Sequence, residues 1–217
     1  MTDSDTGIPI HHLVGSLHDA AHGMSTWLDA IARCQRTFRA AGIAFYAQRG
    51  DGNFDETAVL GIAEEFVDSY KHYYHRRENP WARATALARP GVLRTEEVLE
   101  QHTGERGVLR RSGYYADWLA PQGFAHSVSQ IISREDDLTI KFALYRSAKE
   151  GVFESRELKA LTHLQSHLYT ATLASIRNAQ LRAALHSSQV ALERLGQGVL
   201  LLRGDGELVY ANRAAQQ

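Results

Sequence analysis

Apolar residues recur at helical spacing near the start of the chain, after a polar beginning. Positions 17–31 carry this spacing, Ser16 is suited to cap the helix, and Gly42 is suited to end it. The residues at 43–47 are then continuously apolar, and a glycine-rich turn follows at 50–53. We therefore predict one long helix followed by a first strand.

Helix signals dominate the next part of the chain. A helix is expected over 55–77, where an aspartate is the capping residue. Asn79, followed by a proline, is expected to cap a short helix. Thr95 is expected to cap one or two further turns, and another helix is predicted over 103–119, capped by its first residue.

The clearest alternation of apolar and polar positions lies in 124–132 and 138–145. An acidic turn at 134–137 separates these runs, so they predict an antiparallel hairpin. The residues expected on one face are Phe124, His126, Val128, Gln130 and Ile132 in the first strand, and Leu138, Ile140, Phe142 and Leu144 in the second. Those expected on the other face of the second strand are Thr139, Lys141 and Tyr145.

A last helix is predicted over 154–195, a stretch that contains neither Gly nor Pro. The core columns of its heptads are Leu164, Ala171, Asn178, Leu185 and Leu192, and Ala174, Leu181, Ser188 and Leu195. Such a seam predicts a parallel coiled coil between two copies through residues 164–195, and the lone Asn favours a homodimer. The alternative is a single amphipathic helix that folds back on its own domain.

The chain ends in a second predicted hairpin, over 198–212. Because a lone two-stranded hairpin is only marginally stable in water, we expect a further domain to begin here and to be cut off. The predicted division is a sensory domain at 13–153, a connecting and dimerisation helix at 154–195, and the start of another domain at 196–217.

Composition narrows the class of protein. Hydrophobic residues make up 44% of the 217 and charged residues 23%, as in an ordinary globular chain. The 24 Lys and Arg against 25 Asp and Glu leave a net charge of -1, which is poorly suited to gripping a phosphate backbone. The lone Cys34 cannot form an internal disulfide, which indicates a reducing, cytoplasmic compartment. The longest apolar runs are far too short to span a membrane.

The usual signatures of catalysis are missing from the sequence. It contains no phosphate-binding loop, dinucleotide fingerprint or nucleophile elbow, so we do not expect an enzyme. The pairs His18/His22 and His163/His167 have the i, i+4 spacing of metal ligands, but no obvious third ligand sits nearby. We therefore expect no metal or other cofactor, and keep a histidine-based metal sensor as an alternative.

Aromatic residues gather in two stretches, 70–81 and 114–124. Two helices and a sheet edge could bring them around an apolar cavity with a few polar tips, the usual composition of a small-molecule site. The candidate ligand-binding residues are Tyr70, Tyr74, Asn79, Trp81, Tyr115, Trp118 and His126. The alternatives are that the aromatics fill a solid core and that Asn79 is only a helix cap.

The same part of the chain carries a family resemblance. The residues concerned are 78–81, 91–93, 112–124, 144–146, Phe153, Glu157, Leu158 and the leucine-rich stretch 161–168. Together they resemble the amino-terminal GAF-like sensory region of LuxR-type helix-turn-helix transcriptional regulators, over 13–185. The resemblance implies an α/β (α+β) fold, GAF/PAS-like, in which helices pack on an antiparallel sheet and a long C-terminal signalling helix follows.

The tail resembles the opening of a PAS-type domain, on the residues 192–199, 205–206 and 211–215. Membership of the LuxR family would also imply a carboxy-terminal helix-turn-helix that binds DNA. Nothing resembling its Leu-Thr-x-Arg-Glu start occurs in the sequence. We therefore expect a fragment or the product of a truncated gene, which would reach DNA only through a domain that is not in this chain.

A more distant likeness, to acyl-homoserine-lactone-binding regulators, rests on Tyr70 followed by Asn79-Pro80. That family has an Asp that bonds the lactone's amide N–H where this chain has Asn79, so lactone binding is not expected. The function predicted is signal reception, in which an unidentified small molecule shifts the packing of helices on the sheet. The alternative from another class is a purely structural dimerisation module with a solid aromatic core.

Overall fold

The computed structural model describes residues 7–50, 54–84, 87–135 and 138–216. The chain divides into two compact units, Met1–Thr172 and Leu173–Gln217, and the division falls inside its longest helix. No helix in the described part of the chain combines the length and apolarity needed to cross a bilayer.

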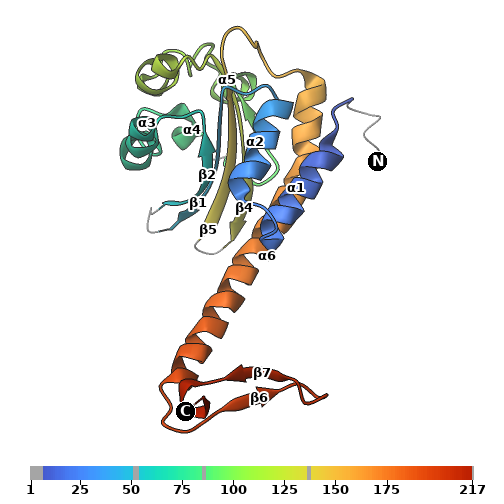
Figure 1. The fold of residues 1–217 in the computed structure, drawn as a ribbon. Helices are drawn as coiled ribbons and strands as arrows, with labels where there is room; N and C mark the ends of the chain where they lie inside the picture. The colour runs from blue at the N-terminus through green and yellow to red at the C-terminus, as the bar shows by residue number, and fades with distance from the viewer. Residues whose placement is uncertain (1–6, 51–53, 85–86, 136–137, 217) are drawn as a thin grey trace. The chain divides into compact units, whose positions relative to one another are not determined.

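Unit 1 is built on a five-stranded antiparallel sheet with the strand order β2-β1-β5-β4-β3 (Figure 1). Its strands are β1 (Gly42–Arg49), β2 (Phe54–Leu60), β3 (Leu93–Thr95), β4 (His126–Glu135) and β5 (Leu138–Arg146). The predicted first strand and the predicted β4–β5 hairpin are confirmed. A bulge between Ile131 and Ser133 shifts the register of that hairpin, so that both Ile131 and Ile132 are buried.

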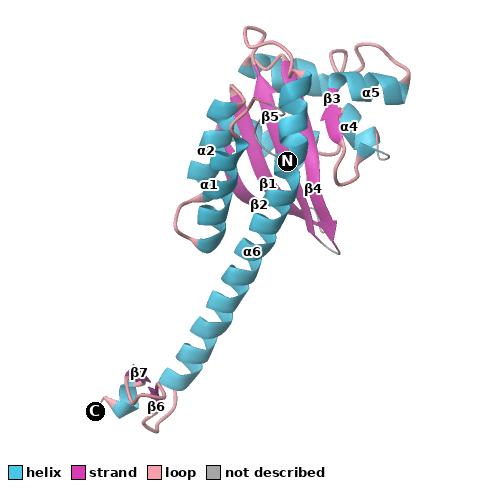
Figure 2. Cartoon of the chain, turned by 90° about the vertical axis from the view of Figure 1, so that its right-hand side faces the viewer, coloured by secondary structure: helices cyan, strands magenta, loops and turns pink. Residues whose placement is uncertain are grey.

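Helices cover both faces of this sheet (Figures 1 and 2). On one face lie α1 (Ile10–His22), α2 (Trp27–Thr37) and the first part of α6 (Ser155–Glu193). Elsewhere around the sheet are α3 (Glu64–Ser69), a π-helical turn (Tyr70–Tyr74), α4 (Pro80–Arg83), α5 (Glu96–Thr103), a second π-helical turn (Tyr114–Leu119) and a 3-10 turn (Ala120–Gln122). The predicted fold class, an antiparallel sheet with packed helices and a long C-terminal helix, is confirmed.

One apolar core of unit 1 lies between the sheet and α1, α2 and α6, and a second cluster, which includes Trp118 and Phe124, packs on the other face. Trp27 of α2 stacks on Phe45 of β1 at 4.8 Å between ring centroids, and Phe45 meets the edge of Phe142 of β5. The apolar alternation predicted for β5 therefore gives the face that packs on these helices. Leu164 and Leu168 of α6 are almost completely buried here.

A buried ion pair joins β5 to the start of α6. The guanidinium of Arg146 is fully buried, and its Nη2 donates to Glu157 Oε1 at 2.6 Å. Nε and Nη2 also donate to the carbonyl of Phe38, just after α2. Because each donor and acceptor has a partner, this charged group can be buried without the large penalty of an unpaired ion.

The single helix predicted over 17–41 is wrong. Gly23, with φ 76°, ends α1, and Thr26 opens α2 in a capping box with Asp29. Ser16 lies inside α1, where its hydroxyl donates to the His12 carbonyl instead of capping a helix. The apolar spacing continues across the break because both helices bury an apolar face in unit 1.

The helix predicted over 55–77 is wrong in its first part. Residues 54–60 form β2, in which Val59 lies opposite Ala44 of β1, and helix begins only at Glu64. The backbone of β1 gains a hydrogen-bonded neighbour in this way, which outweighs a weak local preference for helix. The side chain of the expected cap, Asp55, lies outside the described part of the chain.

The remaining helix predictions are mixed. Asn79 and Thr95 are confirmed as caps, since each side-chain oxygen accepts a backbone N–H of the first turn. Thr103, by contrast, ends α5 instead of opening a helix, and its hydroxyl donates to the Leu99 carbonyl. Helical backbone resumes only at Tyr114.

Unit 2 contains the second part of α6 and a hairpin of β6 (Leu200–Leu202) and β7 (Leu208–Ala211), followed by a 3-10 turn (Arg213–Ala215). The predicted last helix and terminal hairpin are confirmed. Asn212 is fully buried and ties the two together, because it accepts from the Val199 N–H and donates to the Leu192 carbonyl.

Candidate functional site

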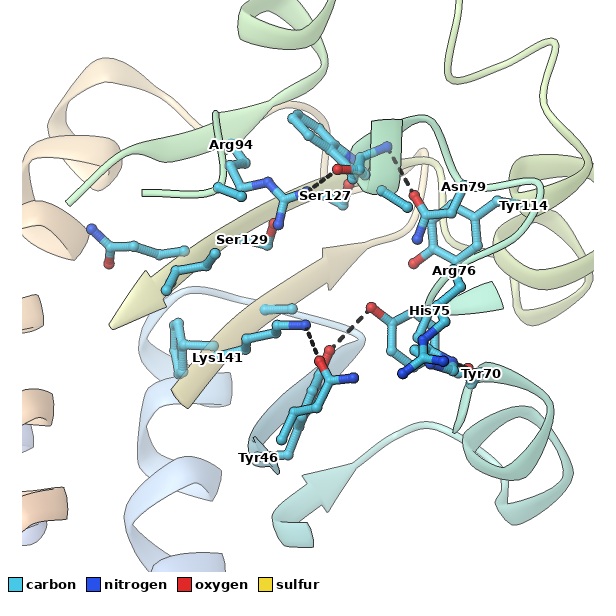
Figure 3. Close-up of a pocket in the computed structure, with 18 of the residues that line it drawn as sticks. Tyr46, Tyr70, His75, Arg76, Asn79, Arg94, Tyr114, Ser127, Ser129 and Lys141 are labelled. Carbon is cyan, nitrogen blue, oxygen red and sulfur yellow. Dashed lines mark hydrogen bonds between the residues drawn. The ribbon is translucent and has the colours of Figure 1, made fainter. Parts of the chain in front are cut away.

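A pocket of about 330 Å³ lies in unit 1, on the face of the sheet opposite α1, α2 and α6 and beside the second apolar cluster. Strands β1, β3, β4 and β5 supply its floor, and the segments around Tyr70, Trp81 and Tyr114 supply its walls. Figure 3 shows the polar side chains that point into it from these elements.

The register of the sheet determines which side chains meet on this floor. Arg94 of β3 lies opposite Ser129 of β4, which lies opposite Ala143 of β5. Lys141, two residues from Ala143 and therefore on the same face, lies opposite Tyr46 of β1. Small side chains in the middle of the floor leave the space into which the long ones extend.

Four tyrosines line the pocket: Tyr46, Tyr70, Tyr114 and Tyr145. The hydroxyl of Tyr46 donates to that of Tyr70 at 3.0 Å (Figure 3). Burial raises the pKa of all four phenols, so that each stays neutral at physiological pH. The four phenols therefore add no negative charge to the pocket, and their oxygens can accept hydrogen bonds.

Four arginine and lysine side chains line the same space: Arg94 is buried and Lys141 half-buried, whereas Arg76 and Arg134 are exposed. Arg94 is only 9% exposed; its Nη2 donates to the Trp81 carbonyl at 3.1 Å, and its guanidinium lies 4.6 Å from the centre of the Trp81 ring. Lys141 Nζ donates to Gln48 Oε1 at 2.6 Å. Burial, and then the charges of Arg94 and Arg134, lower the pKa of Lys141 to about 8. None of the described residues that line the pocket is Asp or Glu.

Three of the seven candidate residues chosen from the sequence line this pocket: Tyr70, Asn79 and Trp81. Asn79 is 95% removed from solvent, at 5% exposure, and its Oδ1 accepts the Trp81 N–H at 3.1 Å. It therefore caps α4 and borders the pocket at the same time, and a hydrogen bond from Asn79 to a ligand stays a prediction.

Trp118 and Tyr74 belong to the packing behind the pocket wall. Trp118 stacks on Tyr114 at 5.2 Å between centroids, and its indole N–H donates to the Phe66 carbonyl at 2.7 Å. It reaches only a small recess of about 30 Å³. Tyr74 is half-buried, with its ring centroid 6.0 Å from that of Tyr114. These two side chains therefore fill the core, as the alternative interpretation of the aromatic residues predicted.

Tyr115 and His126 do not line the pocket. The hydroxyl of Tyr115 accepts a hydrogen bond from Arg110 at 2.8 Å. His126 shares its side of β4 with Val128. Ser127 and Ser129 line the pocket from the other side of the strand, and Gln130 is the one residue of the His126 side among 126–130 that also lines it. Burial and the charge of Arg110 lower the pKa of His126.

Most of the polar lining lies outside the seven residues predicted from the sequence. The residues missed are Tyr46, Gln48, His75, Arg76, Arg94, Tyr114, Ser127, Ser129, Gln130, Arg134, Lys141 and Tyr145. One signal was present, because the alternation in β5 places Lys141 and Tyr145 on the face opposite the apolar one. Arg94 lies in a three-residue strand, which is too short to show any period.

The histidine pairs do not gather a metal site. No group of three or more His, Cys, Asp or Glu side chains suited to hold a metal ion occurs in the ranges that the structure describes. His18 and His167 meet edge to face, with ring centroids 6.4 Å apart. Cys34 is fully buried, and burial raises the pKa of its thiol to about 12, so the reactive thiolate is suppressed.

Unit 1 is thus a mixed α/β domain that carries a polar pocket on one face of an antiparallel sheet. Its fold is similar to that of the ligand-binding domain of VqsR from Pseudomonas aeruginosa, with a TM-score of 0.55, 13% identity and coverage of 77% of this chain and 96% of that chain. The chain also matches the phycoerythrobilin-bound GAF domain of a cyanobacterial phytochrome, with a TM-score of 0.48, 14% identity and coverage of 76% and 94%. No protein-family model and no curated protein matches the sequence.

Proposed function

We propose that unit 1 is the ligand-sensing domain of a LuxR-type transcriptional regulator. The observation that carries this proposal is the pocket of about 330 Å³, whose volume falls in the range of small-molecule sites, about 300–1,000 Å³. A purely structural module with a solid core would have no cavity of this size. The fold shared with the VqsR ligand-binding domain and the motifs at 78–81 and 112–124 support the same function.

The signal would leave the pocket through β5. Lys141 and Tyr145 contact the pocket, and the next residue, Arg146, holds Glu157 in the first turn of α6. A ligand shifts this packing only as far as it binds one arrangement more tightly than another. Contact with DNA would be made by a helix-turn-helix domain outside the residues of this chain.

The long helix would join two copies of the protein. Leu181 and Leu185, both at heptad core positions, are each 60% exposed in the monomer. Leu164 and Ala171, at the start of the same seam, are already buried in unit 1. We therefore propose a homodimer in which the part of the seam after position 172 forms the open contact surface.

A thermal-shift screen of the full chain against a panel of small metabolites tests the sensing function. We expect at least one compound to raise the melting temperature in a concentration-dependent way. Ser129→Phe, which fills the floor of the pocket, should abolish this shift, whereas Ser166→Phe on the exposed side of α6 should preserve it. If no compound shifts the melting temperature, or if Ser129→Phe leaves every shift intact, the proposal is wrong.

A further inference from the structure

Arg94 is a buried cation whose hydrogen bonding is incomplete. Its side chain reaches the pocket at 9% exposure, and Nη2 bonds the Trp81 carbonyl. Nε is completely buried and has no partner among the residues that the structure describes. Buried polar groups of native proteins are rarely left without a partner, and a buried charge least of all. The arginine is therefore positioned to bond something that enters the pocket.

A second cation lies on the same floor. Lys141 of β5 and Arg94 of β3 extend from strands on either side of β4, toward the same central space (Figure 3). The charge of Arg94 lowers the pKa of Lys141, and no acidic side chain among the described lining residues offsets the two cations. Like charges are held together in this way at sites that receive an ion of the opposite sign.

The other lining groups suit the rest of such a ligand. Ser127 and Ser129 offer hydroxyls beside the two cations, and neutral phenols face them across the pocket. The rings of Trp81 and Tyr114 provide flat apolar surface for a hydrocarbon or aromatic body. This combination distinguishes an organic acid from a bare inorganic ion, which would leave the aromatic part of the wall without contacts.

We propose that the pocket binds an organic carboxylate, with its carboxyl group between Arg94 and Lys141 and its apolar body against Trp81. This inference rests on the proposed sensing function and specifies the chemical class of its ligand. The planar guanidinium of Arg94 matches the geometry of a carboxylate, and Lys141 adds a second charge-assisted hydrogen bond. A neutral isostere would leave both cations without a counter-charge and should bind about 10- to 100-fold more weakly.

Matched pairs of compounds test the charge of the ligand. The probes are benzoate with benzamide, phenylacetate with phenylacetamide, hexanoate with hexanamide, and inorganic phosphate as an anion without an apolar body. Dissociation constants come from the concentration dependence of the melting temperature of the full chain. We expect at least one carboxylate to bind, and to bind at least tenfold more tightly than its amide and than phosphate.

Three variants locate the charge. Arg94→Met and Lys141→Met should each weaken the binding of the carboxylate about tenfold or more, because each removes one charge-assisted bond. Arg83→Met, at an exposed position of α4 outside the pocket, should leave it unchanged. If Arg94→Met does not fold, because the contact with Trp81 is lost, Lys141→Met carries the test alone.

The outcomes separate this inference from the function on which it rests. If amides or other neutral compounds bind as tightly as carboxylates, and Lys141→Met does not weaken them, the anion class is wrong while sensing stands. If phosphate binds as tightly as any carboxylate, the inference that the ligand has an apolar organic body is wrong. If neither the pairs nor the metabolite panel shifts the melting temperature, both proposals fail together.

Discussion

Lys141 carries its charge in an environment that opposes it. Burial and the nearby charges of Arg94 and Arg134 lower its pKa to about 8, and its main polar contact is the side-chain oxygen of Gln48. The ring of Tyr46 lies 5.8 Å from Nζ and offers weak compensation. The pocket thus stores an unfavourable interaction that a bound anion would relieve.

The lowered pKa of Lys141 predicts how stability depends on pH. The unfolded chain keeps a lysine proton up to the ordinary pKa of 10.5, while the folded chain loses it near 8, so between these values the unfolded state binds more protons. The free energy of unfolding should therefore rise with pH from about 8 to 9. Above that, the unfolded chain loses the Cys34 proton, which the folded chain keeps up to about 12, so the rise levels off before tyrosine ionisation in the unfolded chain reverses it.

Urea unfolding across that pH range measures the slope. Lys141→Met should flatten it, because the titrating group is gone, whereas Lys149→Met at an exposed position should keep it. An unchanged slope in Lys141→Met would show that another group titrates, and that Lys141 is less strained than its surroundings indicate.

Arg146 differs from Lys141, because every N–H donor of its guanidinium has a hydrogen-bond acceptor. Burial opposes the ionised form of Glu157, but its hydrogen bonds from Arg146 and the Glu154 backbone outweigh this, and the pKa of Glu157 is lowered. Removing one partner leaves a buried charge, so Arg146→Met should lower the free energy of unfolding by about 3–5 kcal/mol.

The double variant Arg146→Met with Glu157→Gln should regain part of this loss in denaturant unfolding, since the carboxylate left with only Arg39 at 3.9 Å and the Glu154 N–H is removed. Arg156 pairs with Glu154 at the surface, with both side chains more than half exposed. Arg156→Met should therefore cost less than about 1 kcal/mol. Equal losses of unfolding free energy in Arg146→Met and Arg156→Met would mean that the buried pair of Arg146 and Glu157 stabilises the fold no more than a surface ion pair does.

At the scale of elements, the turn from β2 to α3 depends on one glycine. Gly61 has φ 68°, and a Cβ there would lie 2.1 Å from the Ala41 carbonyl oxygen. That carbonyl belongs to a residue whose N–H bonds Tyr145, and the Gln35 side chain bonds it as well, so it has little freedom to move. Gly61→Ala should lower the free energy of unfolding by about 3 kcal/mol or more.

Gly104 is the matched control for this prediction. It ends α5 at φ 72°, but nothing lies within 4 Å of the position of a Cβ. Gly104→Ala should therefore cost only the left-handed backbone, about 1–2 kcal/mol. Denaturant unfolding of both variants separates the cost of the left-handed backbone from the cost of the clash with Ala41. Equal losses of unfolding free energy would show that the close approach at Gly61 relaxes without cost.

The same turn shows where local sequence stops predicting this fold. Signals that act within a few residues were sufficient at Asn79, Thr95 and the β4–β5 hairpin, because caps and alternation are set by neighbours along the chain. Strand β2 was missed because its partner, not its own residues, makes it extended. The pairing of β1 with β2 contributes more to the stability of the folded chain than the helix propensity of the residues in β2 would.

The candidate site was predictable only in outline. The aromatic clusters around Tyr70 and Trp81 do border the pocket. Whether each of the other candidate residues lines it depends on the direction of its side chain. Strand alternation placed His126 with Val128 on the apolar side, which argued against it, but Gln130 of the same side does line the pocket, so alternation alone did not decide the matter. Arg94 could not have been found, because only the register of β3 on β4 brings it over the floor.

At the scale of the whole molecule, the two parts of α6 differ in how much of their apolar surface is buried. Its first part is buried in unit 1 through Leu164, Leu168 and Ala171. In unit 2 the heptad continues at Leu181 and Leu185, where both side chains are exposed in the monomer. Exposed leucines at regular core positions lose about 25 cal/mol for each Å² of apolar surface that stays in water, which favours a partner helix.

Sedimentation of the full chain tests this expectation. We predict a dimer for the natural sequence and a monomer for Leu181→Lys with Leu185→Lys, because two charges at core positions of each helix oppose pairing. Ala179→Lys with Ala183→Lys adds the same charge outside the core columns and should remain dimeric. Asn178→Leu should raise the melting temperature of the dimer while relaxing its preference for two strands. A natural chain that stays monomeric at all concentrations, or a Leu-to-Lys double variant that stays dimeric, would show that these leucines do not form the contact between copies.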